Sequence, residues 1–186
     1  KIITYGCQMN IHESEKIAGT LRAMGYVECD DENQADVIVF NTCCIRDNAE
    51  KRALGNIGAF KHLKKANPDM ILAVVGCMTQ QDGAGLNLRQ KYPYVDIVLG
   101  TNNLAELENA INMLKNTGKK SVLIDQNENP QVLEGERKYR TSGCNAWLNI
   151  MYGCNNFCTY CIVPYVRGRE RSRKMADVLR EAEALI

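Results

Sequence analysis

The 186-residue sequence has no long apolar run and almost no net charge. Its longest apolar stretch, residues 70–78, is too short to span a bilayer. With 23 basic and 22 acidic side chains, the formal charge of +1 argues against a protein that binds polyanions over its whole surface. The chain opens as a strand, without a secretory signal or an initiator methionine, so we expect that it has been trimmed at its front.

Several familiar motifs are missing as well. The sequence contains no Walker A loop, no GxGxxG fingerprint and no spacing that suggests a Ser-His-Asp triad. Apolar residues at 45% and charged residues at 24% are ordinary for a globular protein and exclude disordered and collagen-like chains. Cysteine, in contrast, is abundant, with nine residues spread over the chain. An odd number of cysteines without an export signal favours metal ligation or thiol chemistry over a disulfide framework.

Short apolar runs alternate with helical patterns in the first part of the chain. Four runs have the character of strands, at residues 2–6, 36–41, 70–76 and 95–100. Between them, apolar residues recur at helical spacing through residues 17–24, 49–63 and 104–114. This alternation predicts an α/β fold with a parallel, doubly wound sheet.

The composition changes near residue 137. Residues 1–136 carry a net charge of −4 and residues 137–186 a net charge of +5. We predict an N-terminal α/β domain at 1–117, a linker at 118–143 with a candidate edge strand at 122–124, and a second unit at 144–186. An apolar run at 146–151, a cysteine-rich loop and a helix capped by Ser172 make this unit one β/α step. One step cannot close a core, so we expect the second domain to be cut off at Ile186.

Cys154, Cys158 and Cys161 follow the predicted strand at 146–151 with the spacing C-x3-C-x2-C. Three thiolates this close can bind three irons of a four-iron cluster and leave the fourth iron open to a substrate-like molecule. The alternative is a structural zinc site with Cys144 as its fourth ligand, although paired CxxC motifs are commoner for that purpose. The spacing favours the cluster.

Cys7, Cys43 and Cys77 each follow one of the first three predicted strands. Because the carboxyl ends of parallel strands lie at one edge of a sheet, we expect these cysteines to converge although they are about 35 residues apart. For one cysteine alone, burial as a small hydrophobic residue would be the better interpretation. For three at equivalent positions, we predict a second three-thiolate cluster.

The remaining cysteines and the two histidines lack such a pattern. Cys44 adjoins a predicted ligand, and neighbouring residues cannot easily both point into one cluster. We treat three cysteines as non-ligands: Cys29, Cys44 and Cys144. His12 and His62 have no partner spacing, and we predict that both lie on the surface of helices.

Residues 167–174, Arg-Gly-Arg-Glu-Arg-Ser-Arg-Lys, hold five cationic side chains. Such a run is usually a solvated face. Here it follows a candidate cluster loop, where an active site would lie in a β/α barrel, and arginine binds phosphate and carboxylate through its planar fork. Two interpretations of this run therefore remain open: a solvated face, and contact of these arginines with nucleic acid or a cofactor.

Together these motifs resemble a known family. The C-x3-C-x2-C motif at 154–161 resembles the signature of radical S-adenosylmethionine enzymes. With Tyr-Gly-Cys-Gln-Met-Asn at 5–10, Asn-Thr-Cys at 41–43, Gly-Cys-Met at 76–78 and the run at 163–173, nearly the whole chain is similar to the methylthiotransferases. The Gly-Cys-Gln-Met-Asn form is more similar to the tRNA-modifying enzymes than to the branch that modifies a ribosomal protein, where a Lys-Asn ending is typical.

The resemblance implies a methylthiotransferase N-terminal domain followed by the start of a partial, truncated β/α barrel of the radical S-adenosylmethionine type. It also implies two [4Fe-4S] clusters, one on each cysteine set. The cluster of the 154–161 motif would cleave S-adenosylmethionine, and the resulting radical would take hydrogen from carbon 2 of N6-isopentenyladenosine at position 37, beside the anticodon. The other cluster would carry or supply the inserted sulfur, which a second S-adenosylmethionine would methylate. Tyr160 would lie near the adenine of S-adenosylmethionine.

The same resemblance implies a tRNA substrate, an electron donor such as flavodoxin or ferredoxin, a cytoplasmic location, no membrane association and a monomer. Members of the family have further barrel steps and an RNA-binding C-terminal domain that are not present in this sequence, so we expect little or no turnover from the chain alone. One alternative is a sibling methylthiotransferase that acts on a ribosomal protein or on threonylcarbamoyl-adenosine in tRNA. The other is a zinc-binding RNA-interaction module without catalysis.

Overall fold

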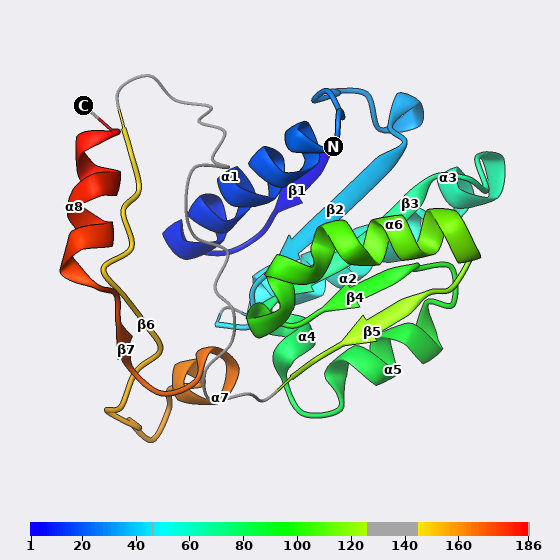
Figure 1. The fold of residues 1–186 in the computed structure, drawn as a ribbon. Helices are drawn as coiled ribbons and strands as arrows, with labels where there is room; N and C mark the ends of the chain where they lie inside the picture. Colours follow the sequence, from blue (N-terminus) through cyan, green and yellow to red (C-terminus); the bar gives the residue numbers. More distant parts are fainter. Residues whose placement is uncertain (46, 126–144, 186) are drawn as a thin grey trace.

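The computed structural model describes residues 1–45, 47–125 and 145–185, and its centre is a five-stranded parallel sheet (Figure 1). The strands lie in chain order across the sheet: β1 Ile2–Thr4, β2 Val37–Thr42, β3 Ile71–Gly76, β4 Ile97–Leu99 and β5 Ser121–Leu123. At the carboxyl ends, Thr4 lies opposite Asn41, and Thr42 lies opposite Gly76. The predicted α/β fold and its strands are confirmed, and β5 extends the sheet past residue 117 at the expected edge position.

Helices cover both faces of the sheet. One face carries α1, Gln8–Ala23, and α6, Leu107–Thr117, which follows the 3₁₀ helix η2, Thr101–Glu106. The other face carries α2, Asp47–Ala59, α3, Lys61–Ala66, and α5, Ala84–Lys91. The short α4, Cys77–Gln80, directly follows β3, and the 3₁₀ helix η1, Glu32–Gln34, precedes β2. Two covered faces agree with the doubly wound prediction, although the strand order does not reverse within the sheet. None of the described helices is long and apolar enough to cross a membrane.

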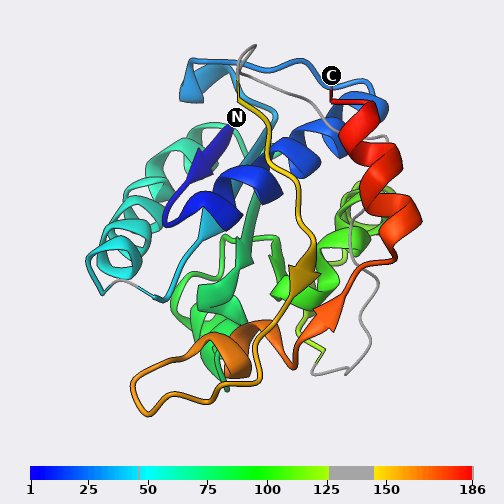
Figure 2. The same cartoon turned by 90° about the vertical axis from the view of Figure 1, so that its left-hand side faces the viewer.

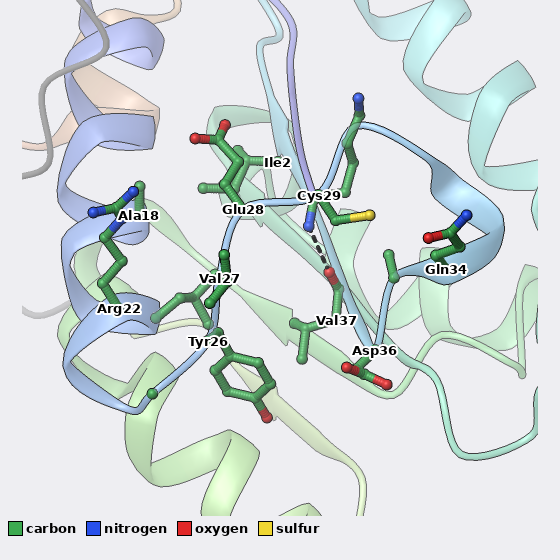
Figure 3. Close-up of a pocket in the computed structure, with 14 residues that line it drawn as sticks. Ile2, Ala18, Arg22, Tyr26, Val27, Glu28, Cys29, Gln34, Asp36 and Val37 are labelled. Carbon is green, nitrogen blue, oxygen red and sulfur yellow. Dashed lines mark hydrogen bonds between the residues drawn. The ribbon is translucent and has the colours of Figure 1, made fainter.

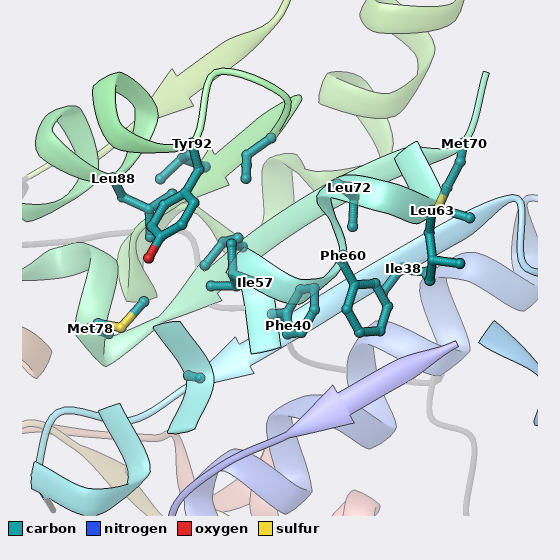
Figure 4. Close-up of a cluster of buried hydrophobic side chains, with 14 of the residues drawn as sticks. Ile38, Phe40, Ile57, Phe60, Leu63, Met70, Leu72, Met78, Leu88 and Tyr92 are labelled. Atoms are coloured by element: carbon teal, nitrogen blue, oxygen red, sulfur yellow. The ribbon is translucent and has the colours of Figure 1, made fainter. Parts of the chain in front are cut away.

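The central strands are buried on both sides, and their residues alternate between two apolar clusters. Ile38 and Phe40 of β2 face α2 and α3, where the rings of Phe40 and Phe60 meet edge to face with centroids 5.0 Å apart (Figure 4). Val37 and Val39 of the same strand join the cluster of α1 and α6. Because both faces are covered, these strands appear in the sequence as continuous apolar runs.

Two helices end at glycines, as the sequence predicts. α1 ends just before Gly25, and Gly118 caps α6 in the left-handed conformation with φ of 69°. The apolar stripe predicted at 49–63 is divided into α2 and α3, because the backbone turns at Phe60 as its ring packs into the core.

The second unit is less regular than the sequence predicts. β6, Met151–Tyr152, pairs antiparallel with β7, Arg171–Ser172, while α7, Val163–Arg167, lies between them in the chain and α8, Met175–Glu183, follows. The strand predicted at 146–151 is therefore wrong in length, since β7 pairs with only two residues. The predicted helix start is also wrong: Ser172 pairs with Met151 in the ribbon, and α8 begins at Met175 after Lys174.

α7 places the second unit at the carboxyl edge of the sheet, beside α4 (Figures 1 and 2). The Thr101 hydroxyl, at the start of η2, donates a hydrogen bond of 2.5 Å to the Val166 carbonyl. The Lys16 ammonium of α1 donates a 3.0 Å hydrogen bond to the Tyr152 hydroxyl. The second unit therefore contacts both the start of η2 and helix α1.

Candidate metal centre at the carboxyl edge of the sheet

Cys7, Cys43 and Cys77 lie at the carboxyl ends of three adjoining strands. Cys7 precedes α1, Cys43 directly follows β2, and Cys77 is the first residue of α4. Cys43 and Cys77 are fully buried, and Cys7 is half-buried. The strand order β1-β2-β3 thus brings these three backbone positions to one edge of the sheet, as the sequence predicts.

Two glycines allow these strand ends to approach closely. Gly6 has φ of +120°, and a Cβ atom there would lie 2.3 Å from the Cβ of Cys43. Gly76 has φ of +108°, and a Cβ atom there would lie 2.4 Å from the Thr42 carbonyl oxygen. At both positions the backbone angle and the lack of space exclude a side chain, so glycine is required directly before Cys7 and directly before Cys77.

Two buried asparagines hold the ends of β1 and β2 together. The Asn10 Oδ1 accepts hydrogen bonds from the Cys7 backbone N–H, at 3.3 Å, and from its thiol, at 3.5 Å. The Asn10 Nδ2 donates to the Thr42 carbonyl over 3.1 Å and to the Asn41 Oδ1 over 3.2 Å. The residues around Cys7 and Cys43 are therefore part of one hydrogen-bond network.

Cys44 lies closer to the site than its place in the sequence suggests. Its sulfur interacts with the Cys77 thiol, and this interaction lowers the pKa of Cys44. The same interaction, followed by burial, raises the pKa of Cys77 well above its ordinary value. Cys43 instead packs against Gly6 and accepts a 3.4 Å hydrogen bond from the Ile45 backbone N–H. Cys43 thus lies against the end of β1, and Cys44 against the end of β3. Cys44 adds a fourth thiol to this edge of the sheet.

Arg167 reaches the same edge from α7. Its guanidinium forms a buried ion pair with Glu13 of α1, at 2.7 Å, and also interacts with the Cys77 thiol. Burial alone would lower the pKa of Arg167, but the charge of Glu13 raises it above its ordinary value. A permanent positive charge therefore lies beside Cys77.

The C-x3-C-x2-C segment forms an exposed loop between β6 and α7. At its start, the Cys154 N–H donates to the Gly168 carbonyl over 3.2 Å, and at its end the Cys161 N–H donates to the Cys158 carbonyl over 2.9 Å. Cys158 is exposed, whereas Cys154 and Cys161 are half-buried. Tyr160, which we expect near the adenine of S-adenosylmethionine, is 91% exposed.

The described part of the chain holds no three His, Cys, Asp or Glu side chains gathered closely enough to bind a metal ion. The fold brings together the backbone positions of one set, with two buried cysteines and an arginine beside one of them. Thiols are the donors that iron–sulfur clusters use, and a nearby cation compensates the charge of thiolates. The donor chemistry therefore fits a thiolate-bound cluster.

The histidines and the cysteines that were predicted not to be ligands have different outcomes in the structure. His62 is exposed as predicted, but His12 is only 1% exposed and lies 3.6 Å from Glu15. The surface prediction for His12 is wrong because α1 packs on the sheet and also contacts the second unit, which buries Lys16 as well. Cys29 donates a 3.1 Å hydrogen bond to the Asp31 carbonyl, away from the other cysteines. Cys144 and most of the predicted linker lie outside the described residues.

The basic run at 167–174 is not a uniform solvated face. Arg167 pairs with Glu13, and Arg173 pairs with Glu181 at 2.6 Å. Arg169 is exposed and lies over the Phe157 ring, 4.7 Å from its centroid. Sequence reasoning missed the internal roles because pairs far apart in the chain leave no local signal.

A cavity of about 310 Å³ lies at the opposite, amino edge of the sheet (Figure 3). It is lined by the end of α1, by residues 25–29 and by the start of β2. Its side chains carry charge of both signs, including Arg22, Glu28 and Asp36, and its cysteine is Cys29. None of the six predicted ligands lines it, so the cavity is separate from the cysteine edge.

These features define an α/β protein whose parallel sheet carries thiols at the carboxyl ends of three adjoining strands. The model of a family described as "Uncharacterized protein family UPF0004" matches residues 1–100, more than half of the chain. The chain belongs to this family.

Longer relatives match the chain over its full length. It is 50% identical over 185 residues to the tRNA-2-methylthio-N(6)-dimethylallyladenosine synthase of Clostridium tetani, and it covers 41% of that protein. Proteins of the same name from Carboxydothermus hydrogenoformans and Moorella thermoacetica are 48% identical over 185 and 186 residues, with 42% of each covered. The chain therefore spans about two fifths of the length of these curated relatives. Their names confirm the predicted resemblance to the methylthiotransferases and favour neither alternative.

Proposed function

We propose that the chain is the cluster-binding part of a radical S-adenosylmethionine enzyme that methylthiolates carbon 2 of N6-isopentenyladenosine at position 37 of tRNA. The observation that carries the proposal is the placement of Cys7, Cys43 and Cys77 at three adjoining strand ends, with the 154–161 loop joined to the same edge through α7. The names of the longer relatives support the substrate.

In this proposal each cysteine set holds one [4Fe-4S] cluster. Bound clusters would supply the electron for cleavage of S-adenosylmethionine and the sulfur for insertion. The chain's own residues bind and orient these groups. Cys154, Cys158 and Cys161 would leave one iron open, and Tyr160 would lie near the adenine of S-adenosylmethionine.

The residues around the first set hold its ligands in place. Gly6 lets β1 approach β2, and Asn10 fixes the backbone of Cys7 against the end of β2. Burial of Cys43 and Cys77 excludes water from two of the three sulfurs. Cys44, in contact with Cys77, is a thiol close to the proposed ligands without being one of them.

The proposed partners follow from the same reaction. They are a tRNA that carries N6-isopentenyladenosine and a one-electron donor such as flavodoxin or ferredoxin, in the cytoplasm, with the enzyme as a monomer. The proposed domains are 1–117, extended by the edge strand β5, and 144–186, joined by the linker between them. The second domain would be the first step of a β/α barrel.

The decisive experiment is a measurement of iron, sulfide and zinc per chain after anaerobic reconstitution. Two four-iron clusters predict about eight irons per chain and broad absorption near ~400 nm. Replacing the first set, Cys7, Cys43 and Cys77, by alanine should halve the iron and leave the other cluster intact. Cys29→Ala is the matched control and should leave the iron unchanged. About one zinc and no iron would overturn the proposal.

The proposed substrate must be tested with the full-length protein, because the chain covers only about two fifths of the length of its relatives. Mass spectrometry of tRNA nucleosides from cells that lack the gene should show N6-isopentenyladenosine without its 2-methylthio form. Restoring the full-length gene should restore the modified nucleoside, and a copy without the first cysteine set should not. Loss of a modification on a ribosomal protein or on threonylcarbamoyl-adenosine instead would assign the enzyme to a sibling branch.

A further inference from the structure

Arg167 connects the two cysteine-bearing parts of the chain. It lies six residues after Cys161, at the end of α7, and is only 9% exposed. Its Nη1 and Nη2 donate to the two carboxylate oxygens of Glu13 on α1, over 2.7 and 3.3 Å. Two-point pairing of guanidinium with carboxylate fixes direction as well as distance, so this ion pair holds α7 against α1.

The same guanidinium interacts with the first cysteine set. α7 packs beside α4, whose first residue is Cys77, and the charge of Arg167 acts on the thiol of that cysteine. The Arg167 Nε–H is buried and has no hydrogen-bond partner among the described residues. Buried donors are normally satisfied, so this nitrogen retains the capacity to donate one further hydrogen bond.

We propose that Arg167 is the positioning residue that couples the two cysteine sets, because it fixes the loop of Cys161 on the sheet and presents its positive charge to metal-bound sulfur at Cys77. The charge role of Arg167 rests on the proposed function, since it requires a cluster on the first cysteine set. The positioning role does not depend on a cluster and follows from the fold alone.

Glu13 gives the inference an internal test. It is the counter-ion of Arg167, with a side chain that is 7% exposed, and its charge is opposite in sign. Addition of an electron to a cluster is favoured by a nearby positive charge and opposed by a nearby negative one. Arg167→Gln and Glu13→Gln should therefore shift the reduction potential of the first cluster in opposite directions, which a purely structural role cannot produce.

The positioning role is tested on the metal-free chain by hydrogen exchange. Arg167→Gln and Glu13→Gln should each speed exchange of the backbone amides at 165–167 by at least about tenfold, because either change leaves a buried charge without its partner. Arg180→Gln is the matched control, since Arg180 is exposed and its ion pair is with the half-exposed Asp177 in the same helix. Unchanged protection of residues 165–167 in both variants would overturn the positioning role.

The charge role is tested on the reconstituted chain with Cys154, Cys158 and Cys161 replaced by alanine, so that one cluster remains. Its midpoint potential should fall in Arg167→Gln, rise in Glu13→Gln and stay unchanged in Arg180→Gln. Arg167→Lys, which keeps the charge, should stay closer to the parent than Arg167→Gln. Shifts in the same direction for Arg167→Gln and Glu13→Gln, or no shift in either, would overturn the charge role.

The two failures can be told apart. If the parent with one cysteine set binds no iron, the proposed cluster on that set fails, and the charge role falls with it. The exchange measurement still decides whether Arg167 joins the two parts. If iron binds normally and the potentials do not move, the proposed function stands and the charge role alone is wrong.

Discussion

Asn10 and Asn41 hold each other through reciprocal hydrogen bonds at the carboxyl edge of the sheet. The Asn10 Nδ2 donates to the Asn41 Oδ1 over 3.2 Å, and the Asn41 Nδ2 donates to the Asn10 carbonyl over 2.8 Å. Both residues are fully buried. Since Asn10 also accepts from Cys7, and Asn41 lies two residues before Cys43, this asparagine pair sets the relative position of two proposed ligands.

Removal of one partner should therefore destabilise the fold and the site together. We expect Asn41→Ala to lower the free energy of unfolding by about 2 kcal/mol, because it removes both buried hydrogen bonds that join the two asparagines, although Asn10 keeps its bonds to Thr42 and Cys7. Asn102→Ala is the control, since its side chain makes an exposed 3.0 Å bond to the Asp125 carbonyl, and it should change stability by less than about 0.5 kcal/mol. Denaturant unfolding of the metal-free chain measures both. Equal losses would contradict the role given to the pair.

Gly6 should be intolerant of any side chain for a reason that goes beyond backbone strain. Gly25→Ala tests strain alone, because Gly25 has φ of +89° and no heavy atom lies within 4 Å of the place where its Cβ would be, and it should cost about 1–2 kcal/mol. Gly6→Ala adds a clash with Cys43 and should cost at least about 3 kcal/mol. It should also lower iron uptake by the first cysteine set, measured per chain after reconstitution. The prediction fails if both variants lose the same stability and keep full iron.

The strand positions were predictable from the sequence because burial on both faces makes each strand a short apolar run. Cysteines that follow such runs could be assigned to one edge, since parallel strands share the direction of their ends. This reasoning needs only local sequence and the rules of sheet topology, and it located Cys7, Cys43 and Cys77 correctly on the backbone.

Contacts between distant segments were not predictable. The sequence places Arg167 in a basic run and Glu13 in an ordinary helix, and nothing local indicates that the two side chains pair across 154 residues. His12 was misplaced for a related reason, since the second unit contacts α1 on a side that the helical pattern alone leaves to solvent. Cys44 illustrates the limit for side chains: its backbone position follows from β2, but its contact with Cys77 does not.

Asp96 should be the most sensitive carboxylate at the amino edge of the sheet. It is buried just before β4 and accepts from Lys64 at 2.8 Å and from the Leu72 backbone N–H at 3.0 Å, with Lys120 at 3.1 Å. Asp96→Asn leaves both lysines without their counter-ion and should lower the free energy of unfolding by about 3 kcal/mol. Asp82→Asn, at an exposed position, should stay within about 0.5 kcal/mol. Because a buried pair is screened little, the loss should persist in ~1 M salt, and its disappearance there would contradict the assignment.

The attachment of α8 offers a comparison between two ion pairs on one helix. Glu181 pairs with Arg173 at 2.6 Å, and both side chains are about nine-tenths buried, while Arg173 also donates to the Asn149 carbonyl. Asp177 pairs with Arg180 at 3.3 Å, and the side chains are 48% and 75% exposed, respectively. Glu181→Gln should therefore loosen α8, with a loss of about 2 kcal/mol of local stability, because it removes the negative charge that lies 2.6 Å from the buried Arg173 guanidinium.

Asp177→Asn is the matched change on the same helix and should alter local stability by less than about 0.5 kcal/mol, as exposed pairs do. Hydrogen exchange of residues 175–183 measures both variants under identical conditions. Faster exchange in Glu181→Gln alone would place the anchor of α8 at the buried pair. Equal exchange in the two variants would mean that the ribbon of β6 and β7, and not the contact of Glu181 with Arg173, keeps the helix in place.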